Sequence, residues 1–218
     1  MPQPTENQRL TTDKESIMSE EVTTVQDYLL KILPYQQRAF AQIHRFGIER
    51  PAILFRGKKA KQPLVAKISE LCDKNDITKI ISFERERHEL LKRRLNLNLS
   101  DWDIVALEQH HGIPTRFLDW TSNALTALWF ALGREESSYN ETGLSEVWIL
   151  ETANADFEIP EDERSPIPHE KGSRTVIFTP QMIDCRIIAQ DSYMMRQVYE
   201  QKDKGKAKKL ATRLCQFD

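Results

Sequence analysis

The 218-residue sequence contains few glycines, few cysteines and no long apolar run. Its seven glycines form neither a GxxxxGKS/T loop nor a GxGxxG loop, which excludes the common glycine-rich nucleotide sites. No stretch approaches the roughly 20 apolar residues that a membrane helix needs. Residues 1–20 are also too polar for the apolar core of a secretory signal. We therefore expect a cytoplasmic protein that has no membrane partner.

The cysteine and charge content excludes further classes of protein. Cys72, Cys185 and Cys215 form no CxxC pair and have no ligand-like spacing to any histidine, so we expect reduced thiols. The 31 Lys and Arg residues nearly balance the 33 Asp and Glu residues. A net charge of -2 argues against a protein whose main task is to coat nucleic acid or an anionic membrane.

The composition divides the chain into three parts. Residues 1–20 are rich in Gln, Thr, Ser and Glu without an apolar period, and we expect a flexible tail. Residues 21–200 carry the apolar patterns of one folded domain. Residues 201–218 form a basic C-terminal segment, in which residues 202–213 hold six basic side chains and one acidic one. This segment is either an exposed helix or a contact for an anionic partner, such as a protein or nucleic-acid target.

Apolar periodicity predicts an α+β fold, with N-terminal helices packed on a small mixed or antiparallel sheet. Helices are expected over 22–46 with a break at Pro34, over two segments between 63 and 99, over 101–111 and over 124–133. Strands are expected over 52–57, 143–150, 174–178 and 186–189, and a surface loop over 159–169.

Three local signals refine these helices. A capping box at Ser100 and Asp103 should begin the helix at 101, and Gly112 should end it. The charge run 84–87 is typical of a solvated helix face. The helix over 124–133 is apolar nearly all round, so we expect it to be central, with Thr121 or Ser122 as its cap.

A dense group of polar residues precedes this apolar helix, over residues 108–123. Polar groups beside a core must be hydrogen-bonded, or they cost about 1–3 kcal/mol each. The group is therefore either a structural network or a site. Arg116 and Asp119 are expected to pair or to share a network. Arg56, which ends the strand over 52–57, is expected to reach the same cavity as Asp119.

A metal-dependent hydrolase is one alternative that the residues leave open, with His110, His111 and Asp119, joined by Glu108, as ligands. No HExxH spacing is present, and adjacent histidines cannot point the same way on a helix. We therefore expect no metal ligand. A serine hydrolase is disfavoured because no GxSxG turn surrounds Ser122.

Three segments in order resemble the FRG domain, which is named after its Phe-Arg-Gly tripeptide. They are Leu54-Phe55-Arg56-Gly57, the block from Leu107 to Asn123 (LEQHHGIPTRFLDWTSN), and Ala127-Leu128-Trp129-Phe130-Ala131. The family pattern for the second block is QHxGxPTRLLDWT, followed by an AxxFA helix. The resemblance spans roughly residues 25–197. This sequence departs from the family at Lys58, where Gln is frequent, and over 189–193, which only partly follows AQxGxF.

A more distant similarity links Arg56 and the Thr121-Ser122 pair to the Arg and Ser-Thr-Ser motifs of ADP-ribosyltransferases. It implies a sheet core of that kind, with Arg56 on the phosphates or ribose of NAD and the hydroxyls at the nicotinamide pocket. A guanidinium suits a phosphate because it binds two oxygens at once and stays charged. The glutamate of those enzymes has no clear match, and Gln190 and Glu200 lie nearest in order.

These resemblances imply binding of a phosphate-bearing nucleotide, with NAD as substrate for ADP-ribosyl transfer or NAD glycohydrolysis in a toxin or phage-defence role. The candidate catalytic residues are Arg56, Glu108 and Asp119, and the candidate substrate-binding residues are Gln109, His110, Thr115, Arg116, Thr121 and Ser122. The other reading is a non-enzymatic binding module in which the same polar cluster is structural.

Overall fold

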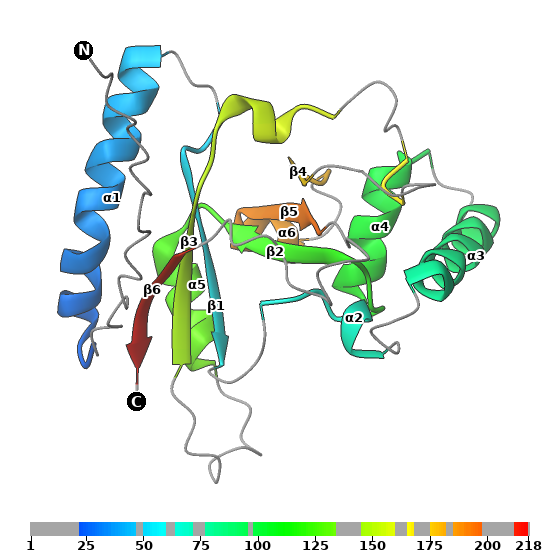
Figure 1. Ribbon diagram of the computed structural model, residues 1–218, viewed down its shortest axis with the longest axis horizontal. Helices are drawn as coiled ribbons and strands as arrows, with labels where there is room; N and C mark the ends of the chain where they lie inside the picture. Colours follow the sequence, from blue (N-terminus) through cyan, green and yellow to red (C-terminus); the bar gives the residue numbers. More distant parts are fainter. Residues whose placement is uncertain are drawn as a thin grey trace, which may run out of the picture.

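The computed structural model describes residues 22–46, 50–59, 64–71, 77–95, 98–133, 145–159, 165–167, 175–181, 185–197 and 212–217. It confirms the expected α+β fold: helices surround one six-stranded antiparallel sheet (Figure 1). The strand order is β4 (Val176–Phe178), β5 (Ser192–Arg196), β2 (Phe117–Thr121), β1 (Ile53–Lys59), β3 (Ser145–Glu151) and β6 (Thr212–Phe217). The FRG-like tripeptide therefore lies on a central strand.

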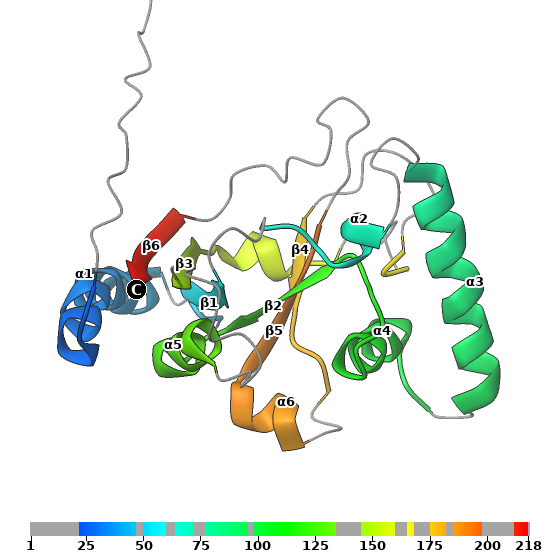
Figure 2. The same cartoon turned by 90° about the horizontal axis from the view of Figure 1, so that it is seen from below.

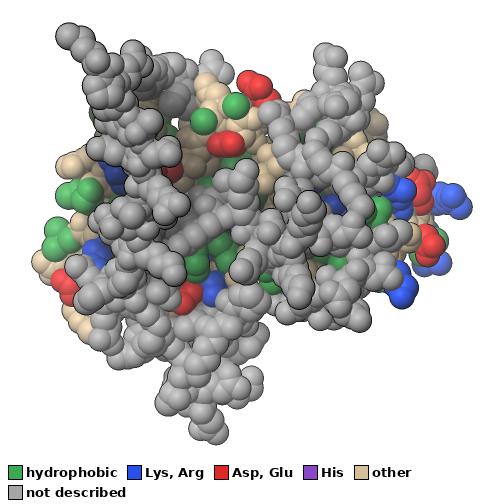
Figure 3. All heavy atoms as spheres, in the orientation of Figure 1, with side chains coloured by type: hydrophobic (Ala, Val, Ile, Leu, Met, Phe, Trp, Pro, Cys, Tyr) green, Lys and Arg blue, Asp and Glu red, His purple; other side chains and the backbone are tan. Residues whose placement is uncertain are grey.

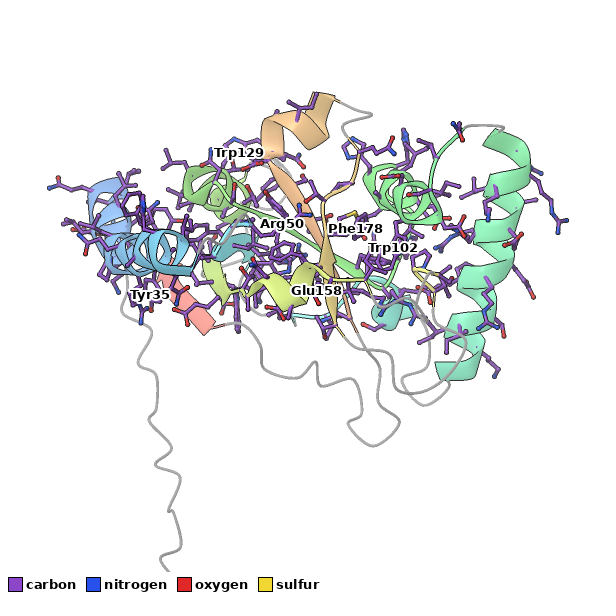
Figure 4. The ribbon with its side chains drawn as sticks, turned by 90° about the horizontal axis from the view of Figure 1, so that it is seen from above. Tyr35, Arg50, Trp102, Trp129, Glu158 and Phe178 are labelled. Carbon is purple, nitrogen blue, oxygen red and sulfur yellow. The ribbon has the colours of Figure 1, made fainter. Side chains whose placement is uncertain are left out.

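Alternation along β1 places neighbouring side chains in two different cores. Ile53 and Phe55 pack with α1 (Val25–Phe46) and α5 (Ala124–Leu132), while Leu54 packs on the other face with Leu118 and Trp120. A third cluster lies at the β4 end of the sheet. There the ring centroids of Trp102 and Phe178 are 5.0 Å apart (Figure 4).

Helix α1 is continuous through Pro34, so the expected break at that residue is wrong. Proline removes one backbone hydrogen bond from a helix interior. Buried side chains on both sides of it, Tyr28 and Ile32 before and Ala39 after, compensate by packing on the core. The hydroxyl of Tyr28 also donates to the carbonyl of Ala124 at 2.7 Å, which ties α1 to α5.

Helix α5 lies so close to β1 that only glycine fits at position 57. A Cβ on Gly57 would lie 1.8 Å from the carbonyl oxygen of Ala127. Asn123 caps this helix by accepting from the amides of Leu125 and Thr126, so the expected cap at Thr121 or Ser122 is wrong. One face, with three alanines and Leu128, is buried, whereas Leu125, Trp129, Phe130 and Leu132 are exposed. The helix is therefore not buried all round as expected.

Helices α2 (Ile68–Leu71), α3 (Ile77–Leu95) and α4 (Asp101–His110) follow the predicted order. The cap at Ser100 is confirmed, because its hydroxyl accepts from the Asp103 amide, and Gly112 has a φ of +79° after the helix. The Asp103 carboxylate accepts from the Ser100 hydroxyl and from the Gln181 amide. The charge run over 84–87, in the middle of α3, is not simply a solvated face. Glu84 and Arg87 turn inward to the α4 side, and charged side chains cover the outer surface at that end of the molecule (Figure 3).

The predicted strand over 186–189 is instead helix α6 (Cys185–Gln190), followed by a turn at Asp191 with a φ of +46° and then by β5. Tertiary contacts override the β-preference of Ile187 and Ile188 here. Helices α5 and α6 lie on one side of the sheet, and the short 3-10 helix η1 (Asn154–Phe157) lies on the other (Figure 2).

Several predictions fall outside the described residues. They are the tail over 1–20, Cys72 and most of the basic segment; residues 212–217 of that segment form β6. In the surface loop expected over 159–169, Ile167 is buried. Within the part of the chain that the structure describes, no helix combines the length and apolarity required to cross a membrane.

Candidate functional site

The sheet opens between β1 and β2, and a cavity of about 320 Å³ lies at this opening. One register pair, Phe55 with Thr121, joins the two strands, whereas seven pairs join β1 to β3 and five join β2 to β5. The polar residues that line the cavity are Arg56, Gln109, His110, Asp119, Thr121, Gln190 and Ser192. Sparse strand pairing thus leaves room in which polar side chains from five elements converge.

Arg56 and Asp119 line this cavity together, as expected from the sequence. Arg56 Nη1 donates to the main-chain oxygen of Asp119 at 2.5 Å and lies 4.0 Å from its carboxylate Oδ2. At this point the Arg56 side chain joins β1 to β2 by a hydrogen bond, whereas backbone hydrogen bonds join the strands elsewhere in the sheet. This contact spans the opening and fixes the direction of the guanidinium.

A hydrogen-bond relay behind the cavity orients the Asp119 carboxylate. The Thr115 hydroxyl donates to Gln109 Oε1, and Gln109 Nε2 donates to Asp119 Oδ1 at 2.5 Å. Both ends of the Gln109 amide are thereby engaged, which fixes which way the amide points. Thr115 is buried, so the relay has a rigid base.

Protein groups satisfy only part of the charge and of the hydrogen-bond donors of the Arg56 guanidinium. Its side chain is 24% exposed, while that of Asp119 is 56% exposed. Its Nε is buried and has no hydrogen-bond partner among the described residues. Burial lowers the pKa of Arg56, and the Asp119 carboxylate opposes that shift. Because an arginine stays protonated in proteins, the cavity wall carries a positive charge with donor capacity to spare.

The turns after β2 and α6 meet beside the cavity. The Thr121 hydroxyl donates to the carbonyl of Gln190 at 2.6 Å and accepts from the Asn123 amide at 3.0 Å. The Ser122 hydroxyl donates to the Asp191 carboxylate. Both hydroxyls thus bind protein groups, and they join the β2–α5 turn to the turn before β5.

Sequence reasoning did not include Gln190, Ser192 and Phe130 among the site residues, although all three line the cavity. For Gln190 a signal was available, since it lies in the segment that partly follows the AQxGxF pattern. Phe130 lies in the AxxFA helix and Ser192 in the same segment as Gln190, but their place at the cavity depends on how α5 and β5 fold back on β1.

Glu108 and Arg116 lie away from the cavity, at the interface between α3, α4 and the start of β2. Arg116 makes a bidentate, fully buried salt bridge with Glu84 rather than the expected pair with Asp119. The reason is alternation, because residues three apart in an extended segment point to opposite sides. Glu108 accepts from Arg87 at 2.7 Å and is buried.

The two adjacent histidines, His110 and His111, also differ in whether they reach the cavity. His110 lines the cavity, whereas His111 is exposed at the end of α4. Across the described ranges, no group of three or more His, Cys, Asp or Glu side chains could hold a metal ion.

A second cavity, of about 330 Å³, shares Arg56, Gln109 and Asp119 with the first. Two lysines also line it. Lys58 Nζ lies 2.9 Å from Glu146 Oε2 in a buried pair, and Lys67 is exposed. Arg56 therefore stands between two cavities.

Residues 51–140 match the model of the FRG domain family. No curated protein and no solved structure matches the chain. The matched segment runs from two residues before β1 to beyond α5, so it contains Arg56, Gln109, His110, Asp119 and Thr121. Gln190 and Ser192 join the cavity from outside it. The domain bounds of 21–200 expected from the sequence stay a prediction.

Proposed function

We propose that this chain, whose residues 51–140 form an FRG domain, binds a phosphate-bearing nucleotide in the Arg56 cavity, with NAD as the leading candidate. One observation carries the proposal: a partly exposed arginine lines a cavity, and protein groups compensate its guanidinium only in part. An anion with several oxygen atoms would satisfy it, because charge-assisted bonds to a guanidinium are short and strong.

The size and polarity of the cavity support a nucleotide. A volume of about 320 Å³ lies within the range of small-molecule sites, in which a few polar groups fix the orientation of the ligand. Gln109 and Ser192 can hydrogen-bond ribose hydroxyls. The similarity of Arg56 and Thr121-Ser122 to motifs of ADP-ribosyltransferases supports NAD within this class.

We further propose that the site cleaves NAD, because the carboxylate of Asp119 lies at the cavity wall 4.0 Å from Arg56 Nη1. In this reaction the bond between ribose C1′ and nicotinamide nitrogen breaks, and nicotinamide leaves with the electron pair. Asp119 stabilises the positive charge that develops on the ribose. Water, or a nucleophile of an acceptor, then bonds to C1′ and loses a proton to Asp119 or to solvent.

Gln109 has a positioning role in this scheme. Its amide holds Asp119 Oδ1, so the second oxygen is left to face the cavity beside Arg56. Glu108 is not needed for the reaction, because its carboxylate lies in the Arg87 pair. Consumption of NAD by such a site would suit a toxin or a phage-defence effector.

The test is to incubate the full-length protein with NAD at stoichiometric concentration, to measure nicotinamide by chromatography, and to measure binding of ADP-ribose by calorimetry. The proposal expects binding and nicotinamide release, both lost in Arg56→Ala. The matched control is Arg38→Ala, which removes an exposed arginine paired with Glu151 on β3.

Two outcomes would contradict the proposal. Binding without release would leave a non-enzymatic nucleotide-binding module, which is the second reading of the sequence. Absence of both would make the polar cluster a structural feature of the FRG domain.

A further inference from the structure

Helix α5 exposes large apolar side chains beside the cavity. Leu125, Trp129 and Leu132, at i, i+4 and i+7, are 51%, 66% and 50% exposed, and Phe130 is 40% exposed. Scattered exposed apolar residues are normal in proteins, but a stripe of them on one short helix marks a binding surface.

An open groove of about 340 Å³ lies along this stripe. Leu125, Trp129 and Phe130 line it from α5, and Ala189 and Gln190 line it from α6. Figure 4 shows Trp129 where α5 and α6 face each other. The groove shares Phe130 and Gln190 with the Arg56 cavity, so the two spaces adjoin at these residues.

The adjoining spaces differ in chemistry. The Arg56 cavity offers a cation and hydrogen-bonding groups, whereas the groove offers two aromatic rings. The rings of Trp129 and Phe130 contact each other edge to face, with centroids 5.1 Å apart and an interplanar angle of 79°. Most of the Trp129 side chain is exposed beside the cavity, where an aromatic ligand can contact it.

We propose that Trp129 stacks the aromatic base of the nucleotide whose phosphates bind Arg56, with Phe130 against the edge of that base. The inference rests on the proposed function, because the anionic group must occupy the adjoining cavity. A nucleotide has both parts that the two spaces accept, a flat π-system and a phosphate group. Any base offers a π-face, so this platform contributes affinity with little choice among bases.

The test compares two ligands that differ in the base. Calorimetry on the full-length protein measures binding of ADP, which has a base, and of inorganic pyrophosphate, which has none. Trp129→Ala should weaken ADP binding by about 5- to 100-fold, the range for loss of one base–aromatic stack, and should leave pyrophosphate binding unchanged. Trp129→Phe should restore most of the ADP affinity.

Leu132→Ala is the matched control, because Leu132 is a half-exposed apolar residue of α5 that does not line the groove. It should change neither affinity. The proposal is overturned if Trp129→Ala weakens both ligands equally or neither. It is also overturned if wild-type protein is a dimer that Trp129→Ala dissociates, since a second copy would then cover the groove.

The two proposals fail in different ways. If pyrophosphate binds, depends on Arg56, and ADP binding is insensitive to Trp129→Ala, the phosphate site stands and the base platform does not. If neither ligand binds to wild-type protein, both proposals are overturned.

Discussion

Two regions of the molecule carry similar polar side chains in different surroundings. At the α3–α4 interface, Glu84 and Arg116 are 1% and 2% exposed and satisfy each other through two hydrogen-bonding nitrogens. At the sheet opening, Arg56 and Asp119 are partly exposed, and the guanidinium keeps a free Nε. The first pair is closed to solvent, whereas the second lines a cavity.

The difference shows how one short segment supplies both scaffold and site. Glu108 and Gln109 are neighbours on α4, but Glu108 turns to α3 and Gln109 turns to the cavity. Arg116 and Asp119 likewise point to opposite sides. Alternation along a helix turn and along a strand therefore separates structural residues from candidate functional ones within about a dozen positions.

The largest effect should come from breaking the closed pair. Arg116→Met leaves the Glu84 carboxylate buried without a partner, so we expect the free energy of unfolding to fall by about 3–5 kcal/mol. Urea denaturation measures this value. The double variant Glu84→Met/Arg116→Leu should recover most of the loss, because apolar groups of similar size replace a buried pair at little cost. If Arg116→Met lowered the free energy of unfolding by less than about 1 kcal/mol, the Glu84–Arg116 pair would contribute no more than an exposed salt bridge, and this prediction would be contradicted.

At the open site, Asp119→Asn should affect the reaction instead of the fold. Removing the negative charge should lower the rate of nicotinamide release by about 100- to 1,000-fold, as for loss of one electrostatic stabiliser. ADP-ribose binding should hold or tighten, because a charge that repels phosphate is gone. Glu151→Gln, an exposed carboxylate on β3, is the control. Unchanged turnover with lower stability would assign Asp119 to the scaffold.

The backbone of the site, unlike its side chains, should be critical for folding. Gly57→Ala places a methyl group against the carbonyl of Ala127 and the amide of Ala131, both backbone atoms that cannot turn away. We expect a loss of about 3 kcal/mol in unfolding free energy. Gly133→Ala meets its nearest atom at 3.1 Å and should lose less than about 1 kcal/mol. Equal losses would contradict the close approach of α5 to β1.

The smallest effect should come from an exposed pair at the edge of the α3–α4 interface. Lys92 Nζ lies 2.7 Å from Asp101 Oδ1, and hydrogen bonding to Asp101 raises the pKa of Lys92. Lys92→Met should lower stability by only about 0.2–1 kcal/mol at neutral pH. Because the folded-state pKa is raised, this contribution is present below the unfolded-state pKa of about 10.4 and disappears as pH rises above it. A larger effect in urea denaturation would contradict the distinction between buried and exposed pairs.

Local signals in the sequence predicted much of the fold. The helix cap at Ser100, a strand over most of 52–57 and the order of helices depend on neighbouring residues, and the structure confirms them. The inward turn of Glu84 could not be predicted in this way, because its partner Arg116 lies 32 positions away. Helix α6 was missed because Ile187 and Ile188 favour a strand when only local preference is considered.

The candidate site was partly predictable for the same reason. Polar residues next to an apolar helix marked Gln109, His110 and Asp119, and the structure places all three at one cavity. Which members of the polar block would be structural was not predictable, since this depends on the direction each side chain takes after folding. The exposed Trp129 was expected to be buried, because periodicity cannot show that the small residues of α5 face the sheet.

The most direct test of the account is calorimetric titration of ADP-ribose into wild-type protein, Arg56→Lys and the double variant Glu84→Met/Arg116→Leu, with urea denaturation of each. Lysine keeps the charge but loses the planar fork, so Arg56→Lys should bind about 10- to 100-fold more weakly, with unfolding free energy within about 0.5 kcal/mol of wild type. The double variant should bind like wild type. Equal binding by Arg56→Lys, or loss of binding only in proportion to stability, would contradict a ligand site at the sheet opening.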